Sequence, residues 1–155
     1  MIGNGNRYRA QAGHTLLELL LVLSILGVMF ALLIPSVNRL YQWFELDAAS
    51  RAVTSDLRSA QVSAWVHGDE HEVKFTRFTP RYTLWEKGVF QKQKQLPNRV
   101  TYRLGYIENT VATLGFSPTR ATGSGSIRLV NATGQQADIK ISPVSGHIVY
   151  DGVQP

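Results

Sequence analysis

The order of apolar and polar positions divides the chain into three stretches. Residues 14–34 are apolar almost throughout, and Glu18 is the only Asp, Glu, Lys or Arg among them. From Val37 to Ala64, apolar residues recur three or four positions apart. From Glu72 onward, short runs rich in β-branched and aromatic residues are separated by turn residues. This pattern predicts an apolar helix, an amphipathic helix and a set of strands, in that order.

Residues 14–34 are long enough to cross a lipid bilayer as one helix. At 1.5 Å per residue, these 21 residues span about 31 Å, which matches a hydrocarbon core of about 30 Å. An ionised side chain is expensive there, at about 2.5 to 3.5 kcal/mol for Asp, Lys or Arg at a helix centre. We therefore expect some partner to compensate the charge of Glu18.

The amphipathic stretch continues this helix past Pro35, which a membrane-embedded or packed helix accommodates as a kink. Its predicted apolar stripe consists of Val37, Leu40, Tyr41, Phe44, Ala48, Ala52, Val53, Leu57, Ala60 and Ala64. The helix should end near Trp65 to Gly68, since glycine adopts the left-handed conformation that commonly ends helices. A coiled coil is the alternative, but sustained heptads are lacking, which favours packing on a sheet of the same chain.

The remainder of the chain reads as an antiparallel β region. Its predicted strands are EVKFTRF, RYTLWEKG, RVTYRLGYI, VATLGFSP, SIRLV, ADIKIS and HIVYD. Glycine-rich turns at TGSG, NATG and PVSG separate the later ones. A long helix followed by strands predicts an α+β fold, in which the helix packs against an antiparallel sheet of about seven strands.

Composition is that of a globular protein with one lipid-compatible segment. The chain has 155 residues, 44% of them hydrophobic and 17% charged, and no cysteine, so no disulfide or thiolate chemistry is available. The net charge of +5 includes Arg7 and Arg9, and falls to +3 without them. A balance of that size does not imply nucleic-acid binding.

The N-terminus has arginines before an apolar run, as a secretory signal does, but MFALLIPSVNRLY offers no A-x-A-like cleavage site after the run. The series Gly13-His14-Thr15-Leu16-Leu17-Glu18, followed by the apolar run and Pro35, resembles the prepilin signature of type IV pilins and pseudopilins. The resemblance implies that a prepilin peptidase cuts after Gly13 and methylates the new N-terminal residue, His14. His14 stands where the family usually has phenylalanine or another apolar residue.

The same resemblance implies a role for Glu18 and a division of the chain. In such filaments the glutamate neutralises the N-terminal amine of a neighbouring subunit in the apolar core, and Pro35 matches a proline of the family's helix. Otherwise, Glu18 reaches the interface as part of a plain single-pass anchor. The expected parts are a leader (1–13), a transmembrane and filament-core helix (14–35), an amphipathic continuation (36–67) and a β-rich head (72–155).

The head also resembles one branch of this family. The segment LGFSPTRATGSGSIRLV, the later ADIKISPVSGHIVYD, and DLRSAQVSAW before EVKF are similar to the GspH and FimT minor pseudopilins and the competence pilin ComGD. The DNA-binding relatives carry arginines in the C-terminal segment, whereas GHIVYDGVQP has no arginine or lysine. The resemblance therefore implies a head of this type without that basic tail.

Other patterns are better explained as loops and edges. HGDEH, residues 67–71, fits the H-x-x-E-H pattern of zinc peptidases, but Gly68 and Asp69 disfavour the helix that such a site needs. Lys92 and Lys94, in FQKQKQLP, are candidate DNA contacts, with a polar edge or loop as the alternative. We predict no catalytic residue, metal site or cofactor, and no enzyme activity.

The leading hypothesis is a minor pilin or pseudopilin at the tip or in the initiation complex of a type IV pilus-like filament. It serves type II secretion, pilus assembly or DNA uptake. The implied partners are other pilin-like subunits, the prepilin peptidase and methylase, an inner-membrane assembly platform, and membrane lipid before assembly; DNA is a further candidate. The N-terminus faces the cytoplasm, since Arg7 and Arg9 precede the helix. The alternative is a stand-alone anchored module that binds DNA or an extracellular polymer.

Overall fold

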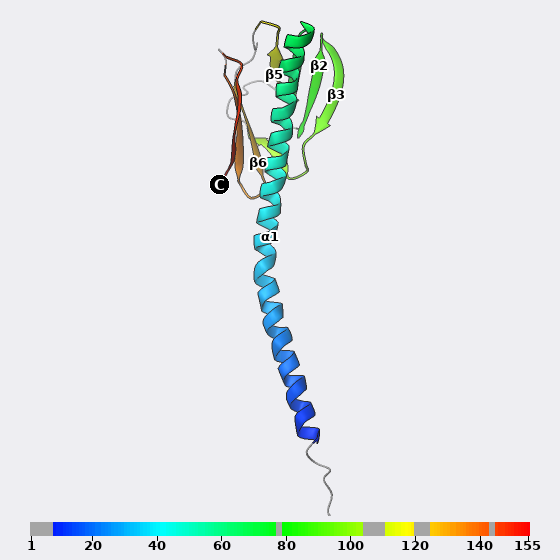
Figure 1. Cartoon of the computed structure of the whole chain (residues 1–155), viewed down its shortest axis with the longest axis vertical. Helices are drawn as coiled ribbons and strands as arrows, with labels where there is room; N and C mark the ends of the chain where they lie inside the picture. The colour runs from blue at the N-terminus through cyan, green and yellow to red at the C-terminus, as the bar shows by residue number, and fades with distance from the viewer. Residues whose placement is uncertain (1–7, 77–78, 104–110, 120–124, 143–144) are drawn as a thin grey trace, which may run out of the picture. The chain divides into compact units, whose positions relative to one another are not determined.

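The computed structural model describes residues 8–76, 79–103, 111–119, 125–142 and 145–155. The chain forms two compact units, Met1–Leu40 and Tyr41–Pro155. One helix, α1 (Tyr8–His67), runs through both units (Figure 1). The predicted boundaries after residues 13 and 35 both fall inside this helix, and residues 1–7 of the predicted leader lie outside the described residues.

The second unit, the head, is built on one side of α1. The buried residues of this side recur three or four positions apart, and none is more than 6% exposed: Leu46, Ala49, Val53, Leu57, Ala60 and Ala64. The helix ends at His67, where the Gly68 amide donates to the Ala64 carbonyl (3.1 Å). Gly68 has a φ of 74°, the left-handed conformation that favours glycine.

The buried stripe differs in part from the predicted one. Phe44, Ala48 and Ala52 are exposed, while Leu46 and Ala49 are buried. The predicted stripe included both Ala52 and Val53, which are consecutive. Consecutive residues of an α-helix point about 100° apart around its axis. The prediction therefore joined two different sides of the same helix, and only its second half, from Val53 onward, faces the core.

Eight strands form two antiparallel sheets. The first sheet has the order β3-β2-β1-β5 and consists of β1 (His71–Thr76), β2 (Arg81–Glu86), β3 (Val89–Gln95) and β5 (Val111–Phe116). The second sheet has the order β4-β6-β7-β8 and consists of β4 (Val100–Arg103), β6 (Gly125–Asn131), β7 (Gln136–Ile141) and β8 (Ile148–Gln154). In Figure 1, β2 and β3 lie on one side of α1 and β6 on the other.

The predicted fold class, a long helix packed on antiparallel strands, is confirmed, with two differences. There are two sheets, because β4 pairs with β6 and β5 pairs with β1, so neither pairs with the strand that precedes it in the chain. There are also eight strands, since the polar segment Val89–Gln95 forms β3. The turn between β2 and β3 consists of two residues, Lys87 and Gly88, whose φ values are 52° and 74°. Positive φ at both positions is typical of the tight hairpin turn that matches strand twist.

Both sheets share one core with α1. The first sheet contributes Val73 and Phe75, and the second contributes Leu129 and Ile139; all four are almost fully buried. Phe75 stacks on Tyr82 with ring centroids 5.5 Å apart. The head is thus held mainly by apolar burial, which fits a chain without disulfides.

Polar contacts fix α1 against the second sheet. Asp47 accepts hydrogen bonds from the Tyr150 hydroxyl (2.7 Å) and from Arg51 (2.8 Å). Burial by itself raises the pKa of Asp47, but these two donors outweigh it and hold the pKa below its usual value. Farther along the helix, Gln61 donates to the Gly146 carbonyl (2.8 Å) in the β7–β8 turn. These bonds join the helix to the β7–β8 hairpin.

Replacement of Leu57 by alanine should test the shared core. Leu57 is fully buried, and removal of a buried leucine side chain costs about 2 to 5 kcal/mol. We expect Leu57→Ala to lower the free energy of unfolding of the detergent-solubilised chain by that amount in a urea titration. Val62→Ala, on the exposed side of the same helix, serves as the control and should change it by less than about 0.5 kcal/mol. Equal effects would contradict the assignment of the buried side.

Candidate functional site

In the first part of α1, from Thr15 to Ile34, no side of the helix is buried in the residues that the structure describes. Every described side chain from Thr15 to Ile34 is exposed, including large apolar ones such as Leu16, Phe30 and Leu32. By length and composition, α1 contains one stretch that could cross a membrane. A helix that is apolar all round requires lipid or other protein around it. This segment is therefore a surface built for contact outside the chain.

The predicted site residues of this segment all lie on α1. Gly13, His14 and Pro35 fall within the helix, and Glu18 lies one turn after His14. The Glu18 side chain is exposed, and no ion pair joins it to another residue in the part of the chain that the structure describes. Ser24, in contrast, donates to the Leu20 carbonyl (2.7 Å). The polar group of Ser24 is thus satisfied within the helix, whereas the Glu18 carboxylate has no ion pair among the described residues.

The head presents an uncharged strip on the exposed side of α1, here called the outer stripe. Its residues recur at three- and four-residue spacing: Phe44, Ala48, Ala52, Ser55, Ser59, Val62 and Val66. All are exposed, and none carries a charge. Small residues at the centre of such a strip allow another helix or sheet to approach the backbone closely. The outer stripe is the side of the head helix that the head itself leaves free.

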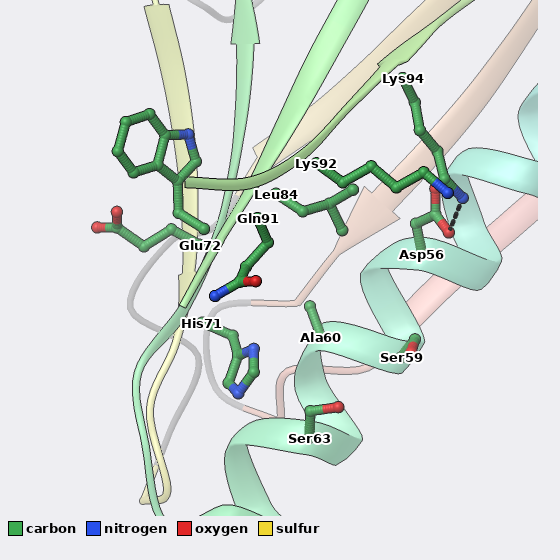
Figure 2. Close-up of a pocket in the computed structure, with 11 residues that line it drawn as sticks. Asp56, Ser59, Ala60, Ser63, His71, Glu72, Leu84, Gln91, Lys92 and Lys94 are labelled. Carbon is green, nitrogen blue, oxygen red and sulfur yellow. Dashed lines mark hydrogen bonds and ion pairs between the residues drawn. The ribbon is translucent and has the colours of Figure 1, made fainter. Parts of the chain in front are cut away.

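A groove of about 280 Å³ lies between α1 and the first sheet (Figure 2). On the helix it is lined by Asp56, Ser59 and Ser63, and on the sheet by side chains of β1 and β3 that include His71 and Lys92. Ser59 belongs both to the groove and to the outer stripe. The groove thus opens beside the free side of the helix.

A β-bulge brings two consecutive side chains of β3 into this groove. Leu84 pairs with Lys92, but Trp85 pairs with Phe90, so Gln91 is an extra residue in β3. Side chains normally alternate between the two faces of a strand, and a bulge interrupts that alternation. Both Gln91 and Lys92 consequently line the groove.

Asp56 joins the helix to two strands at one end of the groove. It accepts a hydrogen bond from the Tyr82 hydroxyl of β2 (2.6 Å) and forms an ion pair with Lys94 of β3 (2.7 Å). Burial and the hydrogen bond to Asp56 both raise the pKa of Tyr82 well above its usual value, so the phenol stays protonated and donates. This charged, partly buried cluster is internally satisfied.

The other end of the groove is not satisfied in the same way. The Nε2 atom of His71 is buried and has no hydrogen-bond partner among the described residues. Lys92 also lines the groove and extends toward Asp56 and Lys94 in Figure 2, but it forms no ion pair in the described part of the chain. Figure 2 shows His71, Gln91 and Lys92 projecting from the sheet toward α1. The groove therefore holds two nitrogen atoms, His71 Nε2 and Lys92 Nζ, that are left without a hydrogen-bond or ion-pair partner among the described residues.

The structure places the predicted DNA contacts, Lys92 and Lys94, on the side of β3 that faces α1. Asp56 offsets the charge of Lys94, whose side chain is 35% exposed. Attraction for phosphate depends on accessible, uncompensated cations, and only Lys92 meets that description here. A DNA contact at these two lysines stays a prediction.

The HGDEH segment spans the junction between helix and sheet. His67 is the last residue of α1 and His71 the first of β1. No group of three or more His, Cys, Asp or Glu side chains is placed to hold a metal ion within the residues that the structure describes. His71 instead belongs to the groove, a role that sequence reasoning missed. The pairing of β1 with β2 and the bulge in β3 create it, and neither is visible in a local pattern.

Comparisons with known proteins bear on both units. Residues 8–34 match the prokaryotic N-terminal methylation motif. No curated protein sequence matches the chain. Among solved structures, the minor pseudopilin EpsH from the type 2 secretion system of Vibrio cholerae is similar, with a TM-score of 0.57 at 14% sequence identity. The match covers 70% of this chain and 97% of EpsH. At that identity the likeness is one of fold.

The Asp56 cluster can be tested with two tyrosines. Tyr82→Phe removes a hydrogen bond to a charged acceptor, and we expect it to lower the free energy of unfolding by about 1.5 to 3 kcal/mol. The control is Tyr102→Phe: the Tyr102 hydroxyl is buried without a partner in the described residues, so its loss should be neutral or stabilising. Urea unfolding followed by tryptophan fluorescence measures both. If the two variants lose the same stability, the hydrogen bond to Asp56 contributes nothing.

Proposed function

Because the chain is type IV pilin-like in its N-terminal motif and in its fold, we propose that it is a minor pilin or pseudopilin. It is made as a prepilin, cut after Gly13, methylated at His14, and incorporated into a type IV pilus-like filament. Type II secretion, pilus assembly and DNA uptake all use such filaments, and the proposal covers this shared role. The role is structural rather than catalytic.

The observation that carries the proposal is the exposure of α1. An apolar segment that is exposed on all sides, from Thr15 to Ile34, continues into a head helix whose outer stripe is exposed and uncharged. Lipid surrounds the apolar segment before assembly, and neighbouring helices replace lipid in the filament core. A plain membrane anchor explains the apolar segment, but it gives no use to the outer stripe.

The exposed Glu18 carboxylate, without an ion pair among the described residues, fits the same role. A buried charge is tolerated when an opposite charge lies nearby, and cleavage after Gly13 creates a new amine at His14. In a filament, the amine of one subunit meets the Glu18 carboxylate of another, so that each compensates the other in an apolar surrounding. Pro35 lies beyond this region, where the family's helix also has a proline, and we assign it a role in shaping the helix for packing.

The proposal implies a set of partners and a location. A prepilin peptidase and methylase processes the chain, an inner-membrane platform inserts it, and other pilin-like subunits surround it. The chain is then a single-pass inner-membrane protein, with a cytoplasmic N-terminus favoured by Arg7 and Arg9 and with the head on the outer side. A stand-alone anchored module that binds DNA or a polymer is the competing function, and the next two experiments separate the two.

Replacement of Gly13 tests processing. We expect the wild-type chain from its native membrane to begin at methylated His14, and Gly13→Ala to retain its N-terminus at Met1, because the peptidase needs the glycine. Intact-mass spectrometry and N-terminal sequencing measure this. Gly27→Ala is a matched control, since an added methyl group there meets nothing within 4 Å. A wild-type chain that still begins at Met1 would refute the proposal and favour the anchored module.

Replacement of Glu18 tests assembly separately. Glu18→Ala should leave membrane insertion intact but reduce incorporation into filaments by more than about tenfold, since it leaves a neighbouring amine unpaired at a cost above about 1.4 kcal/mol. Quantitative immunoblots of the membrane and sheared-filament fractions measure both steps. Ser24→Ala, a polar replacement on the same segment, should assemble normally. Normal assembly of Glu18→Ala would exclude the charge-pairing role.

A further inference from the structure

The aromatic residues of α1 gather where the helix enters the head. Tyr41, Trp43 and Phe44 lie within four consecutive positions. Residues 14–40 contain one other aromatic residue, and residues 45–64 contain none. Tyr41 is 59% exposed, Phe44 is 56% exposed, and Trp43 is half-buried. Rings that served only the core would be covered, so this cluster has surface that the head leaves uncovered.

The three rings point to different sides of the helix. Consecutive residues are about 100° apart, so positions 41, 43 and 44 lie at about 0°, 200° and 300° around the axis. The remaining direction belongs to Gln42, which is buried and whose backbone carbonyl accepts a hydrogen bond from Asn131 (3.3 Å). The rings thus occupy the whole circumference of α1 that the head leaves free. A single protein neighbour covers one side of a helix, whereas a lipid interface surrounds it.

The rings follow the apolar segment at the level of a membrane interface. Tyr41 comes seven residues after Ile34, and Phe44 ten, which is about 10 to 15 Å along a helix. The polar headgroup region adds about 5 to 8 Å to each side of the hydrocarbon core. Long side chains of a helix lean toward its N-terminus, here toward the apolar segment, so the rings reach back into this region. Tryptophan and tyrosine concentrate there in membrane proteins, because each joins an apolar ring to a polar group.

An arginine of the head lies beside the rings. The Arg99 guanidinium stands over the Tyr41 ring, with 5.7 Å between its Cζ atom and the ring centroid. Arg99 is exposed and forms no ion pair in the described part of the chain. Glu45, an acidic residue of the same part of the helix, is only partly exposed, and its Oε2 atom is buried. An exposed guanidinium at this level suits the phosphate of a lipid headgroup, which it can contact through two N–H groups.

We propose that the three rings and this arginine form an interface collar, which lies in the headgroup region of the membrane at the end of the span that leads into the head. The collar consists of Tyr41, Trp43, Phe44 and Arg99. Its rings contact lipid around α1, and its guanidinium binds lipid phosphate. The inference goes beyond the proposed function, because it requires only that residues 14–34 cross a membrane. A pilin subunit and a stand-alone anchored module share that requirement.

Tryptophan quenching in lipid vesicles tests the collar. The chain has three tryptophans, so full-length variants with a single one can be compared: Trp65→Phe with Trp85→Phe retains Trp43, and Trp43→Phe with Trp85→Phe retains Trp65. Lipids brominated on the acyl carbons nearest the headgroup should remove about half of the Trp43 fluorescence or more, because they place the quencher at the interface. Trp65 comes 22 residues later, about 33 Å along the helix, and should be quenched little.

The depth of the bromine atoms completes this measurement. Lipids brominated near the ends of their acyl chains should quench Trp43 less than those brominated near the headgroup. The opposite order would place Trp43 inside the hydrocarbon core and overturn the inference. Absence of quenching at Trp43, or equal quenching of Trp43 and Trp65, would also overturn it. The vesicles contain no other subunit, so these outcomes leave the proposed function to the experiments on Gly13 and Glu18.

Nitroxide labels make the same comparison with all tryptophans retained. The chain has no cysteine, so Phe44→Cys and Val62→Cys each introduce a single thiol at an exposed position of the outer stripe. Oxygen concentrates in lipid, and a water-soluble nickel chelate stays outside it. We expect oxygen to relax the label at position 44 more effectively than nickel, and the reverse at position 62. The same order at both positions would contradict the collar.

A matched pair of charge reversals tests the arginine of the collar. Arg99→Glu should reduce the quenching of Trp43 by brominated phosphatidylglycerol, because a glutamate repels the lipid phosphate. Lys140→Glu also replaces an exposed cation by glutamate, on β7, and should leave this quenching unchanged. Equal quenching in the two variants would exclude the contact between Arg99 and lipid phosphate.

Discussion

Both sheets of the head depend on a single side of one helix. Leu46, Val53 and Leu57 fill the space between the sheets, and the alanines at positions 49, 60 and 64 let the strands approach the helix backbone. No other helix occurs in the described head, so neither sheet has another partner on which to bury its apolar face. This constraint fixes the orientation of α1 about its axis. It thereby decides which residues form the outer stripe.

The two parts of α1 place opposite demands on their residues. In the apolar segment, contact with lipid or other protein needs no particular side, so the sequence is apolar in every direction. In the head, one side is reserved for the core, and the opposite side is exposed and carries the outer stripe. Alanine and serine at the centre of the outer stripe suit an exposed side, because they expose little apolar area and occupy little space.

The features that could be predicted are those that local sequence determines. The nearly uninterrupted apolar run over residues 14–34 defines the membrane-length segment, and Gly68 marks the end of the helix. The prediction failed where the structure depends on residues far apart in the sequence. No local pattern indicates that β4 pairs with β6 instead of β3, so a single sheet was predicted where there are two. Segment 89–95 lacks apolar alternation and becomes a strand through its hairpin partner β2. The groove depends on the bulge, the pairing of β1 and the position of the helix together, so its lysines and His71 could be singled out in advance but not brought together.

The edge of the first sheet has a consequence for how one head meets another. β3 is an edge strand, and an unprotected edge is a template for pairing with strands of other molecules. Charged side chains that point inward from an edge obstruct the addition of another strand, because pairing would enclose them. Lys92 and Lys94 are of this kind, and the bulge further disturbs the regular ladder. The heads of separate molecules are thereby kept from joining edge to edge into aggregates.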